Sequence, residues 1–246
     1  MTIRGKVVVI TGASAGIGAA TAKTLAAKGA HLFVGARREA PLQELVHTIR
    51  AAGGTAAYQI VDVTDQAAVT RFITAARTRY GRIDVLYNNA GIMPNAPFRD
   101  LRVADWEAAF QVNVLGVLYG IAAALPLMQE QGFGQFIATD SNAGHVVNPN
   151  AGVYAGTKFA LRAIMDALRQ EEGPHGIRST MISPGNVKTN LWQSAGTAEL
   201  KAQIHQREQA IGLRPVDIAN AVCYAIDQPE DVGIDEILIR PTVQQN

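Results

Sequence analysis

The chain has 246 residues, a formal net charge of +1 and 48% hydrophobic residues, so it is long enough to bury a large core. The balanced charge excludes the basic footprint of a nucleic-acid or anionic-membrane partner, and we expect neither. The single cysteine, Cys223, excludes an internal disulfide and a thiolate metal cluster, and the five histidines lack metal-ligand spacing. No metal site is expected.

The start of the chain runs directly into an apolar stretch that is too short for a secretory signal. We find no later segment of membrane-spanning length without polar interruption, so we expect a cytoplasmic protein. No linker rich in Pro, Gly or Ser divides the chain, which predicts a single domain over residues 1–246.

Short β-branched segments alternate with longer Ala- and Leu-rich segments along the chain. The predicted strands are 6–10, 31–35, 56–60, 83–87, 135–139, 177–182 and 236–239. The predicted helices are 17–28, 40–52, 66–80, 103–131, 151–172 and 216–226. This alternation predicts an α/β fold with a doubly wound parallel sheet of seven strands and helices on both faces. Residues 190–213 are polar and follow the carboxyl end of a strand, where ligands bind in such sheets, so we expect a helical lid there.

A glycine-rich turn, Thr-Gly-Ala-Ser-Ala-Gly-Ile-Gly, follows the first predicted strand at residues 11–18. Glycine permits positive φ and close approach of backbone N–H groups to a pyrophosphate, and a helix N-terminus favours negative charge. A purely structural glycine turn is the alternative. The position after the first strand favours a dinucleotide site formed by Gly12, Ser14, Gly16, Ile17 and Gly18.

Arg37 and Arg38 stand at the end of the second predicted strand. Folds that prefer NAD place an acidic residue here for the ribose 2′-hydroxyl, and this chain has none. Two guanidinium groups suit a 2′-phosphate, so NADP(H) is favoured over NAD(H). The alternative is that both arginines are solvated residues at a helix start.

Tyr154 and Lys158 are four residues apart, which places a phenol and an ammonium on one face of a helix. At an effective dielectric of about 20, an ammonium roughly 4 to 5 Å away would lower the phenol pKa by about two to three units. The pair is therefore a candidate proton donor, and a solvated lysine beside a half-buried tyrosine is the alternative.

The chain contains four further motifs or residues of interest: Asn88-Asn89-Ala90-Gly91, Asn113, Ser141 and Pro184-Gly185-Asn186-Val187-Lys188-Thr189. Taken in chain order with the motifs above, they resemble the classical short-chain dehydrogenase/reductases, over almost the whole chain. The resemblance implies a Rossmann-type sheet in the order 3-2-1-4-5-6-7 and a homotetramer, or a dimer.

The resemblance also implies a role for each matching residue. Tyr154 would be the proton donor or acceptor, Lys158 would lower its pKa and hold the nicotinamide ribose, and Ser141 would orient the substrate oxygen. Asn113 would hold a water in a proton relay behind Lys158. The further cofactor contacts implied are Asp62 and Val63 at the adenine, Asn89, Ala90 and Gly91 along the cleft, and Pro184, Gly185, Val187 and Thr189 at the nicotinamide and pyrophosphate.

Three positions depart from the family pattern. Asp140 stands where the family usually has a small or hydroxylic residue, and we expect it to be solvated or paired rather than catalytic. Residues 235–242 lack the common Gly-Gly ending and resemble an NADP-preferring subgroup. Ala15 stands where many NADP-preferring relatives have a basic residue, so the NADP prediction depends on Arg37 and Arg38.

The expected function is an NADP(H)-dependent oxidoreductase that interconverts a small-molecule ketone or aldehyde and an alcohol. Met93, His145 and Trp192 are the candidate substrate contacts. His145 in a solvent-facing position and Trp192 in a packing role are the alternatives. A nonenzymatic NADP-binding sensor or scaffold is the alternative function, and an epimerase or dehydratase is disfavoured because such enzymes usually need more chain beyond the sheet.

Overall fold

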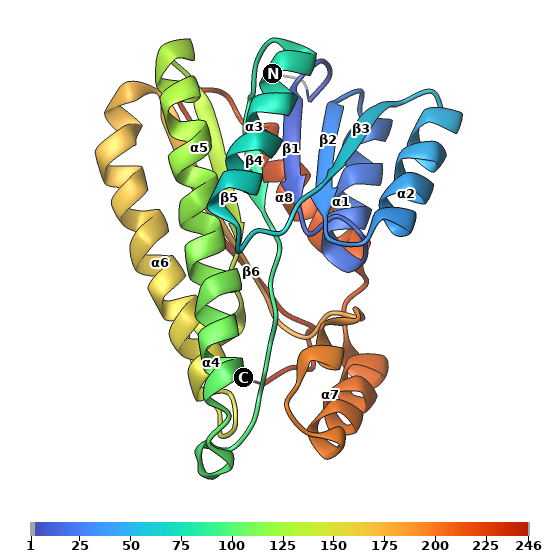
Figure 1. Ribbon diagram of the computed structural model, residues 1–246, viewed down its shortest axis with the longest axis vertical. Coiled ribbons are helices and arrows are strands. Elements are labelled where there is room, and N and C mark those ends of the chain that lie inside the picture. The colour runs from blue at the N-terminus through green and yellow to red at the C-terminus, as the bar shows by residue number, and fades with distance from the viewer. Residues whose placement is uncertain (1–2, 246) are drawn as a thin grey trace.

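The computed structural model describes residues 3–245, which form a seven-stranded sheet in the order β3-β2-β1-β4-β5-β6-β7 (Figure 1). All neighbouring strands pair in parallel, so the predicted sheet and its order are confirmed. The strands are β1 Val7–Thr11, β2 His31–Ala36, β3 Thr55–Ile60, β4 Val85–Asn88, β5 Gly134–Thr139, β6 Ile177–Pro184 and β7 Glu236–Ile239.

Successive side chains of the central strands point to opposite faces of the sheet, which divides the core into two layers. Val8 and Ile10 of β1 are fully buried in one cluster, with α1 Gly16–Ala27, α2 Glu39–Ala51 and α8 Pro215–Ile226. Val9 is fully buried in the other cluster, with α3 Gln66–Tyr80, α5 Gly116–Gln131 and α6 Gly152–Glu172. Strands buried on both faces read as continuous apolar runs, which is why β1 is Val-Val-Val-Ile-Thr.

The predicted helix over residues 103–131 is interrupted by a π-helical turn. α4 Val103–Phe110 leads into the π-helical segment η2 Gln111–Leu115, and α5 continues from Gly116. A π-turn contains an extra residue per turn, and such turns are frequent at functional sites. Asn113 lies at the centre of this one.

By length and mean hydropathy alone the helical run Val103–Gln131 could cross a membrane. The polar residues Gln111 and Asn113 interrupt its apolar sequence, as expected from the sequence for such segments. Its buried residues Val117, Ile121, Ala124 and Met128 recur at helical spacing and belong to the second core cluster. This stripe is the face by which α5 covers the sheet.

Residues 190–213 form the short 3₁₀ helix η5 Leu191–Ser194 and the helix α7 Ala198–Ile211. Figure 1 shows α7 apart from the two helical layers. Three further 3₁₀ turns, η1 Phe98–Asp100, η3 Asn142–Gly144 and η4 Gly173–His175, lie in the connections.

Candidate active site

A cleft of about 840 Å³ opens at the carboxyl ends of the strands. Ala36, Thr139 and Pro184, the last residues of β2, β5 and β6, line it together with residues of α7. This is the edge of an open parallel sheet where ligands bind. The following predicted cofactor residues line the cleft: Gly12, Ser14, Gly16, Ile17, Arg37, Arg38, Asp62, Val63, Asn89, Ala90, Gly91, Tyr154, Lys158, Pro184, Gly185, Val187 and Thr189.

The glycines of the first loop are required by its shape. Gly12 and Gly16 have positive φ of 66° and 56°, and a Cβ at Gly12 would lie 2.7 Å from the Cα of Ala90. Gly18 does not line the cleft, but its Cβ would lie 2.6 Å from Asn89 Nδ2 and 2.7 Å from the carbonyl oxygen of Gly12. Gly18 therefore occupies a packing position in the first turn of α1, and its contact with the cofactor stays a prediction.

Helix α1 begins at Gly16, and the preceding Ala15 has no polar side chain to cap it. The first amides of a helix lack intrahelical partners, and they attract anions. With the backbone held close by Gly12 and Gly16, this loop fits the pyrophosphate of a dinucleotide.

Asn89 connects three strand ends around that loop. Its Nδ2 donates to the carbonyl oxygens of Thr11 at 3.1 Å and Gly12 at 3.2 Å, and its Oδ1 accepts from Thr139 Oγ1 at 3.1 Å. The amide thus fixes the glycine loop to β4 and β5.

Arg37 and Arg38 are exposed at the end of β2 and line the cleft. Arg38 Nη2 donates to Ser14 Oγ at 3.1 Å, which holds this guanidinium over the glycine loop. Asp62 Oδ1 accepts from the amide of Thr64 at 3.0 Å and from its hydroxyl at 2.9 Å, so a local turn orients this carboxylate. The arginines place positive charge at one end of the cleft.

Tyr154 and Lys158 lie on α6 and are almost completely buried, with exposures of 7% and 5%. Lys158 Nζ lies 5.7 Å from the centroid of the Tyr154 ring and donates to the carbonyl oxygen of Thr139 at 2.6 Å. Ser141 hydrogen-bonds to the Tyr154 side chain, and its Oγ also accepts from the amide of Ala143 at 3.1 Å. The structure thus brings Ser141, Tyr154 and Lys158 together in the cleft.

The expected lowering of the Tyr154 pKa is wrong for this structure. Burial raises the pKa of Tyr154 to about 12, although the hydrogen bond with Ser141 lowers it and the charge of Asp140 raises it further. Burial also lowers the pKa of Lys158 to about 8, against the opposing charge of Asp140. Desolvation outweighs the effect of the Ser141 hydrogen bond on the Tyr154 pKa, so Tyr154 is held protonated near neutral pH.

Asn113 lies outside the cleft lining and is 1% exposed. Its Oδ1 accepts from the amide of Ile92 at 2.9 Å, and its Nδ2 donates to the carbonyl oxygen of Ile92 at 2.9 Å and to Thr157 Oγ1 at 3.1 Å. The π-turn therefore ties the loop after β4, where Ile92 lines the cleft, to α6. Its contact with a water remains a prediction.

Of the three predicted substrate contacts, the structure brings only Met93 to the cleft. His145 Nε2 lies 2.6 Å from Glu236 Oε1, and the Trp192 ring packs on His205 with centroids 4.5 Å apart. These contacts hold the His145 and Trp192 side chains outside the lining of the cleft.

Helix α7 supplies cleft residues that the sequence did not single out: Leu200, Gln203, Ile204, Arg207 and Glu208. Glu208 is 5% exposed, and its Oε2 has no hydrogen-bond partner among residues 3–245. Burial raises its pKa to about 7. Nothing in the sequence distinguishes Glu208 from the exposed glutamate Glu199 on the same helix.

Comparisons with known proteins agree with this geometry. Residues 6–200 match the family model described as short chain dehydrogenase. An uncharacterized oxidoreductase of Listeria innocua is 43% identical over 246 residues, covering 99% of each chain. An alcohol dehydrogenase from the archaeon Thermococcus sibiricus, complexed with 5-hydroxy-NADP, is 31% identical with a TM-score of 0.88 and 98% coverage of each chain.

A short chain dehydrogenase/reductase from Burkholderia phymatum, in complex with NAD, is 27% identical with a TM-score of 0.89, covering 97% of this chain and 90% of that one. Similar chains thus bind nicotinamide dinucleotides of both kinds. The family match over most of the chain, on a cleft that fits such a dinucleotide, means that the chain belongs to the short-chain dehydrogenase family of oxidoreductases.

Proposed function

We propose that the chain is an NADP(H)-dependent oxidoreductase that interconverts a ketone or aldehyde and the corresponding alcohol, with Tyr154 as general acid and base. The observation that carries the proposal is the buried group of Ser141, Tyr154 and Lys158 in a cleft whose other end presents Arg37 and Arg38.

The preference for NADP(H) is supported by the charge at the end of β2. Arg37 and Arg38 line the cleft where an acidic residue would bind the ribose of NAD. A guanidinium presents a planar, permanently charged fork to phosphate oxygens, so these residues would hold the 2′-phosphate. Gly12, Gly16 and the first turn of α1 would hold the pyrophosphate.

A nicotinamide dinucleotide supplies or accepts the hydride when it is bound. The protein handles the proton and the charge on the substrate oxygen. In the reductive direction Tyr154 donates its hydroxyl proton to that oxygen, and Ser141 stabilises the developing negative charge with a hydrogen bond. The raised Tyr154 pKa keeps this proton in place until the oxygen becomes basic. The nearby Lys158 ammonium stabilises the phenolate that remains.

We further propose that Asn113 holds a water of a proton relay on the far side of Lys158 from the substrate. We also propose that the protein is cytoplasmic and forms a homotetramer or a dimer. Family membership supports the water, the location and the oligomeric state.

The test follows the absorbance of NADPH in the presence of ketones, aldehydes and α-diketones. Consumption with any of these carbonyls, and slower consumption with NADH, is the expected result. A nonenzymatic sensor would bind NADPH without consuming it in any mixture, and that outcome would overturn the proposal. Binding measured separately by NADPH fluorescence distinguishes it from a protein that has lost the cofactor site.

A further inference from the structure

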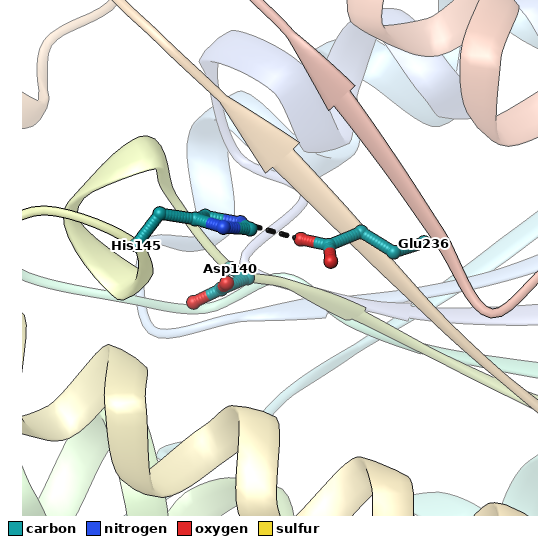
Figure 2. A group of neighbouring side chains, drawn as sticks. All are labelled: Asp140, His145 and Glu236. Atoms are coloured by element: carbon teal, nitrogen blue, oxygen red, sulfur yellow. Dashed lines mark hydrogen bonds and ion pairs between the residues drawn. The ribbon is translucent and has the colours of Figure 1, made fainter. Parts of the chain in front are cut away.

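A group of charged and polar side chains adjoins the cleft, directly after β5, near the end of β6 and at the start of β7. Glu236 Oε1 accepts hydrogen bonds from Ser183 Oγ and from Arg162 Nη1, both at 2.6 Å, and lies 2.6 Å from His145 Nε2. Ser183 Oγ also lies 3.2 Å from Asp140 Oδ2, so its single hydroxyl proton is shared between the two carboxylates and is donated to one of them at a time. We call these five residues the Glu236 network, and Figure 2 shows Asp140 beside the contact between His145 and Glu236.

Possible metal-ligating atoms of Asp140, His145 and Glu236 lie within 4.8 Å of one another. Arg162 already supplies a positive charge at this point. Its Nη1 lies 2.6 Å from Glu236 Oε1, 2.8 Å from His145 Nε2 and 3.7 Å from Asp140 Oδ2. A cation bound there would be repelled by the guanidinium, so the network is an arrangement of paired charges rather than a metal site.

Asp140 belongs both to the network and to the cleft. Its side chain is 0% exposed, and it lines the cleft together with Lys158. Lys158 Nζ is fixed on the carbonyl oxygen of Thr139, the residue directly before Asp140. Asp140 Oδ1 has no hydrogen-bond partner within residues 3–245. One oxygen of the carboxylate is therefore held by the network, and the other is left without a donor next to the active site.

Electrostatics links this carboxylate to Lys158. Burial raises the pKa of Asp140, and the charge of Lys158 is the largest effect that lowers it, ahead of the Ser183 hydrogen bond and the charge of Arg162; the charge of Glu236 raises it. In return, burial lowers the pKa of Lys158, and the charge of Asp140 raises it. A buried ammonium without a counter-ion tends to lose its proton.

Further along the network, burial alone would raise the pKa of Glu236, but hydrogen bonds from Ser183, Arg162 and His145 lower it below its usual value. Glu236 therefore stays charged and holds Arg162 near Asp140. The groups that face Asp140 are Lys158 and Arg162 from α6, Ser183 from β6, and Glu236 from β7.

We infer that Asp140 is a positioning residue that keeps Lys158 charged beside Tyr154, and that Ser183 and Arg162 hold the Asp140 carboxylate in place for this purpose. The inference rests on the proposed function, because the charge of Lys158 affects turnover only if Tyr154 transfers a proton. Its electrostatic part can be measured without turnover.

The experiment titrates Lys158 by NMR in protein labelled at lysine Cε and Nζ. The Lys158 resonance is assigned by its absence from the Lys158→Arg variant. Asp140→Asn removes the charge and keeps the shape of the side chain, so the titration midpoint of Lys158 is expected to fall by about 1 to 3 pH units. Asp166→Asn, which removes an exposed carboxylate two turns further along α6, is the matched control and should leave the midpoint unchanged.

An unchanged or raised midpoint in Asp140→Asn overturns the inference. Asp140→Ser removes the same charge with a smaller side chain, and it serves if the asparagine variant does not fold, as judged by circular dichroism and NADPH binding. An unchanged or raised Lys158 midpoint in Asp140→Ser likewise overturns the inference.

Turnover gives the second readout. If the wild type reduces a carbonyl, its activity should decline at alkaline pH as Lys158 loses its proton. In Asp140→Asn this decline should begin at a lower pH than in the wild type. A uniform loss of activity at all pH values would instead indicate a structural role and overturn the inference. Failure of the wild type to reduce any carbonyl overturns the proposed function, and the NMR titration then still decides whether Asp140 sets the charge of Lys158.

Discussion

The amide of Met93 donates a hydrogen bond to the hydroxyl of Ser194 at 2.8 Å, across 101 positions of the chain. Ser194 in turn donates to the carbonyl oxygen of Leu191 at 2.7 Å. One hydroxyl therefore connects η5 to the loop after β4, on the side of the cleft that Met93 lines.

Ser194→Ala should loosen this connection, because it removes a hydrogen bond worth about 1 kcal/mol. We expect the KM for the carbonyl to rise roughly fivefold and kcat to change less. Steady-state kinetics and amide hydrogen exchange over residues 191–211 measure the effect. Thr70→Ala, which removes an exposed hydroxyl on α3, should change neither. Unchanged exchange in Ser194→Ala would contradict the prediction.

Replacing Arg37 and Arg38 together by alanine should weaken NADPH binding roughly 10- to 100-fold, since two charge-assisted contacts with the 2′-phosphate are lost. The affinity for NADH should change little. Dissociation constants from cofactor fluorescence give the comparison, with the exposed Arg79→Ala on α3 as the control. An equal loss for both dinucleotides would show that these arginines do not select the phosphate.

Tyr154→Phe should lower kcat by about 10²- to 10⁴-fold, because the ring remains and only the proton donor is lost. Binding of NADPH should persist. The measurement is NADPH consumption at saturating carbonyl, beside a binding titration of the same preparation. Near wild-type turnover would remove Tyr154 from the chemistry.

Glu208 should make stability depend on pH. The pKa of Glu208 in the folded chain, about 7, lies above its ordinary value. Its contribution to the free energy of unfolding is therefore present at acidic pH and is lost as the pH rises through 7. Glu208→Gln should therefore match the wild type near pH 4.5 and exceed its free energy of unfolding by about 1 to 3 kcal/mol near pH 8. Denaturant unfolding across this range tests the prediction, and the exposed Glu199→Gln should follow the wild type throughout.

Gly18→Ala and Gly156→Ala form a matched pair. A Cβ at Gly18 would meet Asn89 Nδ2 and the backbone of Gly12 and Ala13 at 2.6 to 3.0 Å, so we expect a loss of about 1 to 3 kcal/mol and weaker NADPH binding. A Cβ at Gly156, inside α6, meets no atom of the described residues within 4 Å. That variant should keep or slightly raise stability, since alanine favours a helix. Thermal unfolding compares them, and equal melting temperatures would refute the packing argument.

The sheet could be predicted from the sequence because strands buried on both faces, such as β1, are continuous apolar runs between turns. The cleft could be predicted because residues at the carboxyl ends of parallel strands meet at one edge, which joins Gly12, Asn89 and Ser141. Local pattern was sufficient for the strands and the glycine loop, whereas the strand order and the roles of Asn89 and Ser141 were implied by the family resemblance.

The orientation of single side chains could not be predicted in this way. His145 follows Ser141 closely in sequence, yet its ring lies against Glu236, which is 91 positions away. The pKa of Tyr154 depends on how completely the fold excludes water, and spacing along a helix carries no such information. The π-turn at Asn113 is equally hidden, because its sequence continues a helical pattern.

The π-turn allows the length of this region to vary by one residue. A π-helical turn holds about one residue more than an α-helical turn of similar rotation, so deleting one residue from Gln111–Leu115 would restore a regular helix and leave α5 in nearly the same orientation. The stripe of Val117 and Ile121 would stay against the sheet. The shorter form would instead lose the bulge that carries the Asn113 amide to Ile92, so the loop after β4 would bear the cost of the deletion.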